Sequence, residues 1–281
     1  MRRKSRALLS PTLLVAPGLV LILALFLYPL GVLVAISFAR SDTVFAKYFE
    51  LFHSAVFIQV LYRTIGVSAM TTFLCFLIGY PLARCVMTAG PKERALLLAV
   101  ILLPFWSNLL VRAYGWMIVL NPKGVINDLL IGLGIIHAPL ALVYNLIGAL
   151  IGMVQIMIPY MVLPIVAVMS RIDPQMQNAA RSLGAGPVAA FVFVYFPMTL
   201  PGVVAGVLLV FTLSLGFFVI PAILGGNAGL MLAQLIEFNV NTSLDWGLAS
   251  AMSTVLLIVT CAIYAISHRW FGLSALWATV R

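Results

Sequence analysis

Long apolar runs recur along this sequence, and they constrain its fold more than any other feature. The runs cover residues 13–38, 58–86, 95–120, 140–170, 198–224 and 248–267. A helix needs about 20 apolar residues to cross the hydrocarbon core of a bilayer. Membrane-spanning strands alternate in polarity at every second residue, and these runs do not alternate. The sequence therefore predicts an all-α membrane protein with six transmembrane helices.

The composition argues against a soluble enzyme, a disordered chain and a nucleic-acid-binding protein. Hydrophobic residues make up 64% of the chain and charged residues only 8%, whereas a soluble domain has roughly 25% charged residues. So few charges cannot coat a soluble fold of this length. The net charge of +9 comes from basic residues that are scattered singly between apolar runs. We therefore expect a lipid bilayer as the surroundings, and no nucleic acid as a partner.

The connections between the runs leave no room for a separate soluble domain. We expect residues 1–281 to form a single transmembrane domain, with a cytoplasmic loop at residues 171–197. Basic residues before the first run are typical of a secretory signal, but a signal has an apolar stretch of only about 7–15 residues. The first run is longer, so we interpret it as a retained helix. The halves of the chain show no internal repeat, which favours a path completed by a second membrane subunit.

Lys and Arg residues predict the orientation. With the N-terminus in the cytoplasm, eleven of them fall inside and three outside. Those inside are Arg2, Arg3, Lys4, Arg6, Arg84, Lys92, Arg94, Arg171, Arg181, Arg269 and Arg281. Those outside are Arg40, Lys47 and Lys123. Because basic residues concentrate in cytoplasmic loops, both termini are predicted to be cytoplasmic.

The loop between the fourth and fifth runs predicts a short helix at residues 174–183. Asp173 is a good N-cap, Pro174 suits the first helical position, and Gly184 suits the left-handed residue after a helix end. One face of this helix carries Met176, Ala179, Ala180 and Leu183. Helices that bind a membrane surface need bulky apolar and many basic residues. The small-residue face therefore favours docking of another protein.

The same loop resembles the EAA loop of bacterial ABC-importer permeases. The resemblance lies in Asn178-Ala179-Ala180, Gly184 and Val194-Tyr195-Phe196-Pro197 at the spacing of that family. It implies a coupling helix that docks into a cleft on a separate ATPase subunit. The implied coupling residues are Asp173, Met176, Asn178, Ala179, Ala180, Leu183, Gly184 and Pro197. Asn178 and Ser182 depart from the family, which usually has acidic residues there, and this puts ion pairs with the ATPase in doubt.

Four further segments resemble spermidine/putrescine-type permeases, most closely the first, B-type, subunit. They are residues 103–116, 124–127, 158–164 and 216–226. The resemblance implies a permease for binding-protein-dependent transport of polyamines, or of a related small amine or opine, across the bacterial inner membrane. It also implies three kinds of partner: a second permease in a heterodimer, two ATPase subunits and a periplasmic solute-binding protein.

Helix-breaking residues in the apolar runs indicate candidate positions along a transport path. They are Pro159 and Pro164 in the fourth run and Pro201, Gly202, Gly206, Gly216 and Pro221 in the fifth. Broken backbone at membrane depth is tolerated only beside protein or a water-filled cavity, and broken helices often border a path. For any one of these residues a tightly packed, kinked helix is an equally good explanation. As a group, they suggest that the fourth and fifth helices line the interface with the second subunit.

Arg63 and Arg112 are the charges that lie well inside the runs. They either reach the outer interface along their apolar stems or act as a gate or an ion pair with the partner subunit. The rings of Phe105, Trp106 and Tyr114 are able to hold a cation, although interfacial aromatic residues have the same pattern. No acidic residue lies deep in a run, so these residues leave an anionic or zwitterionic solute open.

The chain shows no enzyme chemistry of its own. It lacks the Gly-x-x-x-x-Gly-Lys-Ser/Thr loop that binds nucleotide, and its three histidines lack metal-ligand spacing. We expect no catalytic residue, metal or cofactor, with ATP hydrolysis on a separate subunit. The alternatives are a membrane scaffold and an ATP-independent channel or secondary carrier, although ion-driven carriers usually contain buried ionisable groups.

Overall fold

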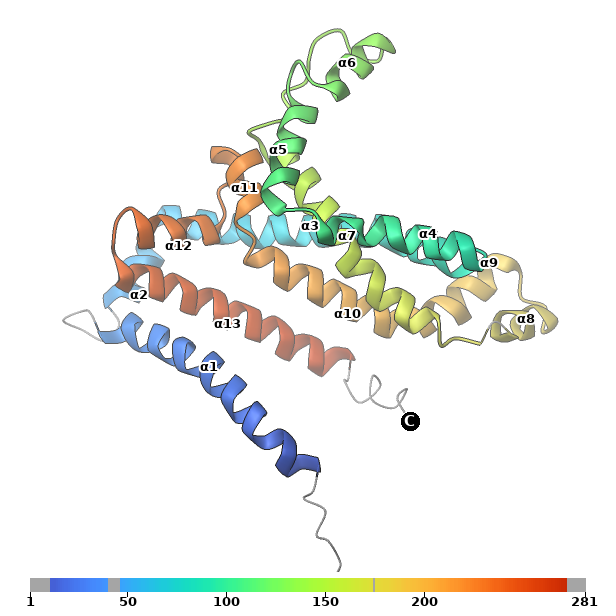
Figure 1. Cartoon of the computed structure of the whole chain (residues 1–281), viewed down its shortest axis with the longest axis horizontal. Helices are drawn as coiled ribbons and strands as arrows, with labels where there is room; N and C mark the ends of the chain where they lie inside the picture. The colour runs from blue at the N-terminus through green and yellow to red at the C-terminus, as the bar shows by residue number, and fades with distance from the viewer. Residues whose placement is uncertain (1–10, 40–45, 174, 272–281) are drawn as a thin grey trace, which may run out of the picture. The chain divides into compact units, whose positions relative to one another are not determined.

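A computed structural model describes residues 11–39, 46–173 and 175–271 (Figure 1). These ranges contain helices and no strand, which confirms the all-α prediction. The α-helices are α1 Pro11–Ala39, α2 Ala46–His53, α3 Ala55–Thr88, α4 Pro91–Leu102, α5 Leu109–Leu120, α6 Val125–Gly132, α7 Leu146–Met169, α8 Gln175–Ser182, α9 Pro187–Ala189, α10 Phe196–Leu215, α11 Val219–Leu224, α12 Leu232–Asn241 and α13 Trp246–Phe271. Shorter turns are the 3₁₀-helices η1 Leu103–Trp106 and η3 Asn227–Gly229 and the π-helix η2 Ala190–Tyr195. Seven residues named above lie outside the described ranges: Arg2, Arg3, Lys4, Arg6, Arg40, Pro174 and Arg281.

Five helices in the described ranges are long and apolar enough to cross a membrane. They are Ala16–Phe38, Ala55–Thr88, Leu146–Met169, Pro187–Leu215 and Trp246–Ser267. A sixth span results if Pro91–Trp106 and Leu109–Gly132, which bend by 103° at their junction, count as one. The third predicted run, 95–120, is therefore not a single straight helix.

The breaks have local causes that apolar content does not reveal. Pro104 lies in the 3₁₀ turn η1 after α4, and Asn108 starts α5 by accepting the Leu110 backbone N–H on Oδ1 at 2.8 Å. Asn145 caps α7 in the same way, with Oδ1 2.9 Å from the Gly148 backbone nitrogen. The fourth predicted run, 140–170, therefore becomes helical only at Leu146.

Contacts divide the chain into two compact units. The smaller unit comprises Met1–Ser54 and Ile236–Leu257, and the larger comprises Ala55–Leu235 and Ile258–Arg281. The organisation of the chain as a single transmembrane domain stays a prediction.

In the larger unit, α3, α7 and α10 pack against one another. Glycines allow this close approach: a Cβ atom on Gly202 would lie 2.9 Å from the Pro164 carbonyl oxygen, and one on Gly206 would lie 3.0 Å from the Met161 carbonyl oxygen. Small residues play this role at helix contacts in membranes. Gly202 and Gly206 are therefore packing residues of α10.

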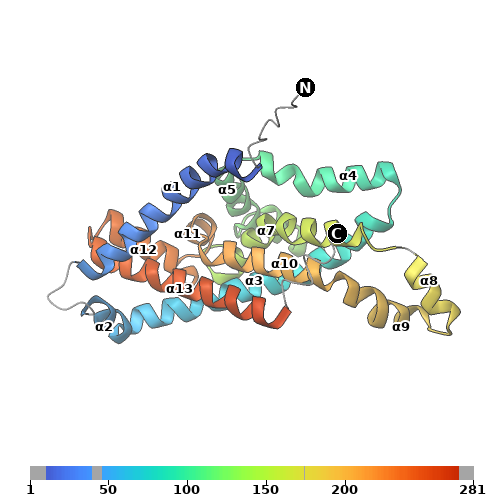
Figure 2. The same ribbon diagram turned by 90° about the horizontal axis from the view of Figure 1, so that it is seen from below.

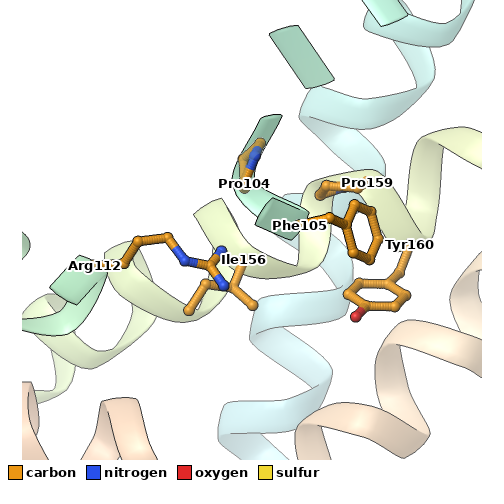
Figure 3. A pocket seen from close by; sticks show the side chains of 6 residues that line it. All are labelled: Pro104, Phe105, Arg112, Ile156, Pro159 and Tyr160. Atoms are coloured by element: carbon orange, nitrogen blue, oxygen red, sulfur yellow. The ribbon is translucent and has the colours of Figure 1, made fainter. Parts of the chain in front are cut away.

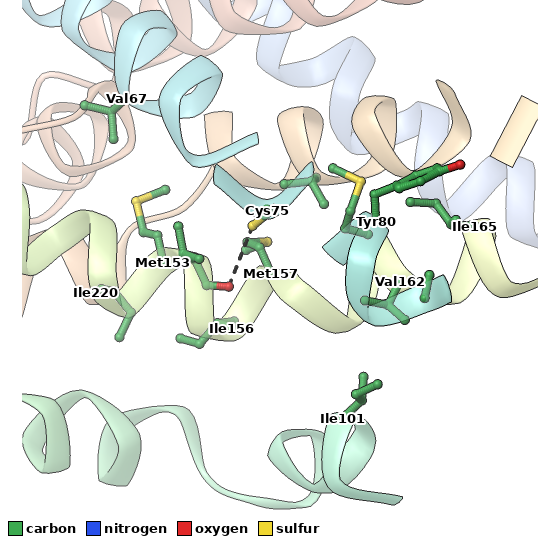
Figure 4. Packing of buried hydrophobic residues seen from close by; sticks show 14 of the residues in the cluster. Val67, Cys75, Tyr80, Ile101, Met153, Ile156, Met157, Val162, Ile165 and Ile220 are labelled. Carbon is green, nitrogen blue, oxygen red and sulfur yellow. Dashed lines mark hydrogen bonds between the residues drawn. The ribbon is translucent and has the colours of Figure 1, made fainter. Parts of the chain in front are cut away.

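Methionines fill the centre of the larger unit. Met153, Met157 and Met161 of α7 are buried, and their flexible side chains suit irregular spaces between helices. Figure 4 shows Met153 and Met157 in this packing. Cys75 of α3 lies among them, with its Sγ atom 3.7 Å from the Val154 carbonyl oxygen. The three helices therefore form one packed body.

The smaller unit joins α2 to the end of α1 and to the turn before α13. Tyr48 Oη lies 2.8 Å from Ser37 Oγ, and the Tyr48 and Phe38 rings are 5.3 Å apart. Lys47 Nζ donates to Asp245 Oδ2 at 3.0 Å. These polar contacts tie together segments that are distant in the sequence.

Candidate functional site

The short helix that the sequence predicts at residues 174–183 is present as α8, Gln175–Ser182. Asp173 caps it, with Oδ1 accepting the Gln175 backbone N–H at 2.8 Å. Gly184 has φ +93°, which confirms the left-handed residue expected after the helix. Gly184 N–H donates to the Arg181 carbonyl at 2.9 Å, and Ala185 N–H donates to the Ala180 carbonyl at 3.1 Å. This pair of hydrogen bonds is the Schellman motif, so α8 has a defined start and a defined end.

The apolar side of α8 is open. Met176 is 48% exposed and Leu183, just beyond the helix, is 90% exposed. No residue of α8 is buried. In both views α8 lies at the end of the larger unit where α3 joins α4 (Figures 1 and 2). The exposed residues of α8 are therefore free to contact another protein.

The other predicted coupling residues lie close by. Asn178 and Ala179 are exposed and Ala180 is partly buried. Pro197 lies in the first turn of α10, directly after the π-helix η2. The structure therefore brings the predicted coupling residues, apart from Pro197, together on one exposed segment.

A cluster that the sequence analysis missed joins this segment to α3. The guanidinium carbon of Arg84 lies 4.8 Å from the centre of the Phe191 ring and 4.5 Å from that of Tyr195. Tyr80 meets the Phe191 and Phe196 rings edge-on at 6.3 and 5.5 Å. Tyr80 and Arg84, like Phe191 and Tyr195, are four residues apart, which places each pair on one helix face. The four-residue spacing within each pair is visible in the sequence. Nothing in the sequence, however, shows that α3 and η2 lie side by side.

Three of the predicted path residues line one pocket (Figure 3). They are Phe105, Arg112 and Pro159, and the remaining lining residues are Pro104, Ile156 and Tyr160. The Phe105 and Tyr160 rings meet edge-on, with centres 5.1 Å apart. The pocket has a volume of about 20 Å³, which is room for roughly one water molecule. It therefore fits a single small group and is not an open passage.

The two arginines of the apolar runs have different surroundings. Arg63 donates from Nη1 to the Asn227 carbonyl at 2.9 Å, so its guanidinium is held by the turn η3. Arg112 Nε is buried and makes no hydrogen bond to any residue that the structure describes. Its Nε therefore lacks the polar partner that a buried N–H group requires.

The remaining path candidates are not gathered at this pocket. Trp106 is 80% exposed and Tyr114 is 53% exposed. Pro164 packs through its carbonyl against Gly202, while Gly216 lies at the break between α10 and α11. Pro221 is buried in α11, where its carbonyl accepts the Gly225 N–H at 2.9 Å. The path assignment of these residues stays a prediction.

The chain resembles known permeases in sequence and in fold, although no family model matches it. It is 35% identical over 223 residues to the spermidine/putrescine transport system permease protein PotB of Haemophilus influenzae, covering 79% of this chain and 78% of the relative. It is 33% identical to PotB of Escherichia coli K12 over 85% of this chain and 89% of the relative. A bacterial alginate ABC transporter solved with an alginate-bound periplasmic protein contains a chain of the same fold, with a TM-score of 0.75 at 17% identity over 91% of this chain and 92% of that one.

These likenesses extend over most of the chain and agree with its apolar helices and its exposed helix α8. The two relatives are permease components, not enzymes. The chain belongs to the PotB-type family of ABC-transporter permeases.

Proposed function

We propose that this chain is one of two different permease subunits of an ABC importer for polyamines or a related small amine. Each permease forms half of the path across the inner membrane. Two ATPase subunits bind on the cytoplasmic side, and a periplasmic binding protein delivers the solute. The observation that carries this proposal is the capped, exposed helix α8 at the EAA spacing. The similarity to the PotB proteins supports the solute class.

The packing of the larger unit suggests how movement is transmitted. ATP binding closes the ATPases, and α8 follows the cleft in which it is docked. Because α3, α7 and α10 are closely packed, they tilt as a body instead of deforming. The tilt exposes the path to one side of the membrane at a time.

The path residues have different roles in this proposal. The Phe105 and Tyr160 rings offer faces that attract an amine. Arg112 repels an amine, so its proposed role is that of a gate or an ion pair with the second permease.

Both termini lie in the cytoplasm, which places Arg84, Arg171 and Arg181 on the side where the ATPase binds.

Co-purification tests the assembly. The chain is solubilised with a mild detergent from its native membrane, and the proteins that accompany it are identified. We expect an ATPase and a second permease. A folded chain that purifies alone and conducts spermidine into vesicles without ATP would replace this proposal with the channel or carrier alternative.

A substitution in α8 tests the mechanism. Gly184→Asp adds a side chain and a negative charge directly after α8, at the end proposed to dock on the ATPase. We expect ATP hydrolysis to continue while spermidine uptake is lost. Normal uptake by this variant, measured in vesicles with the complete importer, would contradict docking through α8.

A further inference from the structure

The π-helix η2 lies directly between the coupling helix and the membrane body. It contacts α8 on one side and continues into α10 on the other. π-helical turns are rare and occur frequently at functional sites, and they are places where helices kink. A displacement of α8 therefore reaches η2 first. Without lateral support, η2 would absorb that displacement by bending.

Arg84 of α3 supplies such support. Its guanidinium lies against both aromatic rings of η2, 4.8 Å from the Phe191 centre and 4.5 Å from the Tyr195 centre. The two rings are stacked, with centres 6.0 Å apart. We call Arg84, Phe191 and Tyr195 the Arg84 clamp. Neither ion pair recorded in the described ranges involves Arg84, so the ring faces are its principal attraction.

Tyr80, one turn earlier on α3, makes a second attachment. Its hydroxyl lies 3.2 Å from Thr199 Oγ1 in α10. Thr199 already donates to the Phe196 carbonyl at 2.7 Å, so Tyr80 is the donor. Two successive turns of α3 therefore hold η2 and the start of α10.

We propose that Arg84 is a positioning residue for transport, and that the Arg84 clamp makes η2 and α3 move together. Displacement of α8 then reaches α3 directly, and through it α7, in addition to travelling along the chain into α10. This inference rests on the proposed function, because it requires α8 to be docked on an ATPase. In this inference Arg84, which lies outside the EAA loop, transmits the displacement of α8 to α3.

The test measures the number of ATP molecules hydrolysed for each spermidine taken up. The complete importer, with its binding protein, is reconstituted in proteoliposomes with radiolabelled spermidine. Arg84→Met keeps the apolar stem and removes the charge, and we expect the ratio to rise about threefold to tenfold. Arg84→Lys keeps a cation over the rings and should restore most of the coupling. Arg94→Met is the control, because it removes the same charge from α4, where no ring contact is recorded in the described ranges.

A second pair of variants keeps the proposal falsifiable if Arg84→Met fails to assemble. Tyr195→Phe retains the ring and should leave the ratio unchanged, whereas Tyr195→Leu should raise it. Since both residues act through one contact, the double variant Arg84→Met/Tyr195→Leu should be no worse than the worse single variant. If the double variant raises the ratio by the product of the two single effects, the inference is overturned. It is also overturned if neither Arg84→Met nor Tyr195→Leu changes the ratio of ATP hydrolysed to spermidine taken up.

The outcomes also separate this inference from the proposed function. If the wild-type complex couples ATP hydrolysis to uptake and Arg84→Met couples equally well, the proposed role of Arg84 is wrong, while the proposed importer function is supported. If the wild-type complex shows no ATP-dependent uptake, the proposed importer function is wrong, and so is the role of Arg84 that depends on it.

Discussion

Gly184 controls where α8 ends, because its φ of +93° lies in the region that L-residues avoid. A Cβ atom at this position would meet no atom within 4 Å, so the cost of a side chain comes from the backbone alone. We expect Gly184→Ala to destabilise the end of α8 by about 1–2 kcal/mol. If uptake requires the formed end, it falls at least about fivefold. Uptake of spermidine by proteoliposomes measures the effect.

Gly186 provides the matched control for this substitution. It has φ −64° and ψ 165°, which any residue adopts, and its Cβ position is also open. Gly186→Ala should therefore leave uptake unchanged, and Gly184→Asn should retain more uptake than Gly184→Ala because Asn tolerates the left-handed region. Equal effects at both glycines would show that α8 does not depend on its Schellman end.

The Lys47–Asp245 ion pair predicts a pH dependence at the smaller unit. Its hydrogen bond to Asp245 raises the pKa of Lys47 above 10.5. The Leu248 backbone N–H, followed by Lys47, lowers the pKa of Asp245 below 3.8. The Asp245 contribution is present above 3.8 and is lost as the pH falls through the lower folded value. The Lys47 contribution is present below 10.5 and is lost as the pH rises through the higher folded value.

The pair therefore stabilises α2 across the whole neutral range. Because the Lys47 and Asp245 side chains are 22% and 37% exposed, solvent screening limits the contribution to about 1 kcal/mol or less. Lys47→Met should speed hydrogen exchange of the α2 amides by up to about fivefold, equally at pH 5.5 and pH 8.5. Lys123→Met is the control, since Lys123 takes part in neither recorded ion pair of the described chain. A difference confined to one end of that pH range would contradict this assignment.

At the scale of elements, two glycines in different helices should respond to alanine in opposite ways. A Cβ atom on Gly206 of α10 would lie 2.9 Å from Met161 Sδ and 3.0 Å from the Met161 carbonyl oxygen, so Gly206→Ala must push α10 from α7. We expect it to lower stability by about 1–3 kcal/mol. Gly66 of α3 has open space, so Gly66→Ala should raise stability by about 0.5–1 kcal/mol through helix propensity.

Unfolding of the purified chain in mixed micelles, with increasing dodecyl sulfate, measures both changes. The opposite signs are the decisive result, because a general intolerance of helix glycines to substitution would destabilise both variants. If Gly206→Ala proves neutral, the α7–α10 contact is looser than the described geometry requires.

The elements that the sequence predicted well are those decided by apolar content or by local capping. Asp173 and Gly184 act on their own neighbours, so the bounds of α8 followed from residues beside it. The 103° bend after Pro104 was not predicted, because the apolar content of run 95–120 is the same whether the helix is straight or bent. Asn108 was its local signal, since an Asn followed by apolar residues is a good N-cap.

Contacts between distant elements were the least predictable part of the site. The Arg84 clamp joins α3 to η2 across more than a hundred residues of sequence, and hydropathy treats its rings as ordinary apolar residues. Gly202 and Gly206 fitted a path or a packing contact equally well until the neighbouring atoms of α7 were known. Arg112 and Phe105 were chosen for their chemistry, and the structure brings them to one pocket.

For the whole molecule, orientation in the membrane is a prediction that can be measured. The larger unit carries α8 at the same end as the α3–α4 junction, and both segments contain basic residues of the side predicted to be cytoplasmic (Figures 1 and 2). Lys123, in the turn between α5 and α6, belongs to the side predicted to be outside.

Single cysteines introduced at Ser182 and Lys123 test this orientation, after the native Cys75, Cys85 and Cys261 are replaced by alanine. An impermeant maleimide added to intact spheroplasts should label Lys123→Cys at once. It should label Ser182→Cys only after the membrane is permeabilised, because basic loops are retained in the cytoplasm. Labelling of Ser182→Cys from outside would place α8 on the side of the membrane that holds no ATP, and docking to an ATPase would then be impossible for this chain.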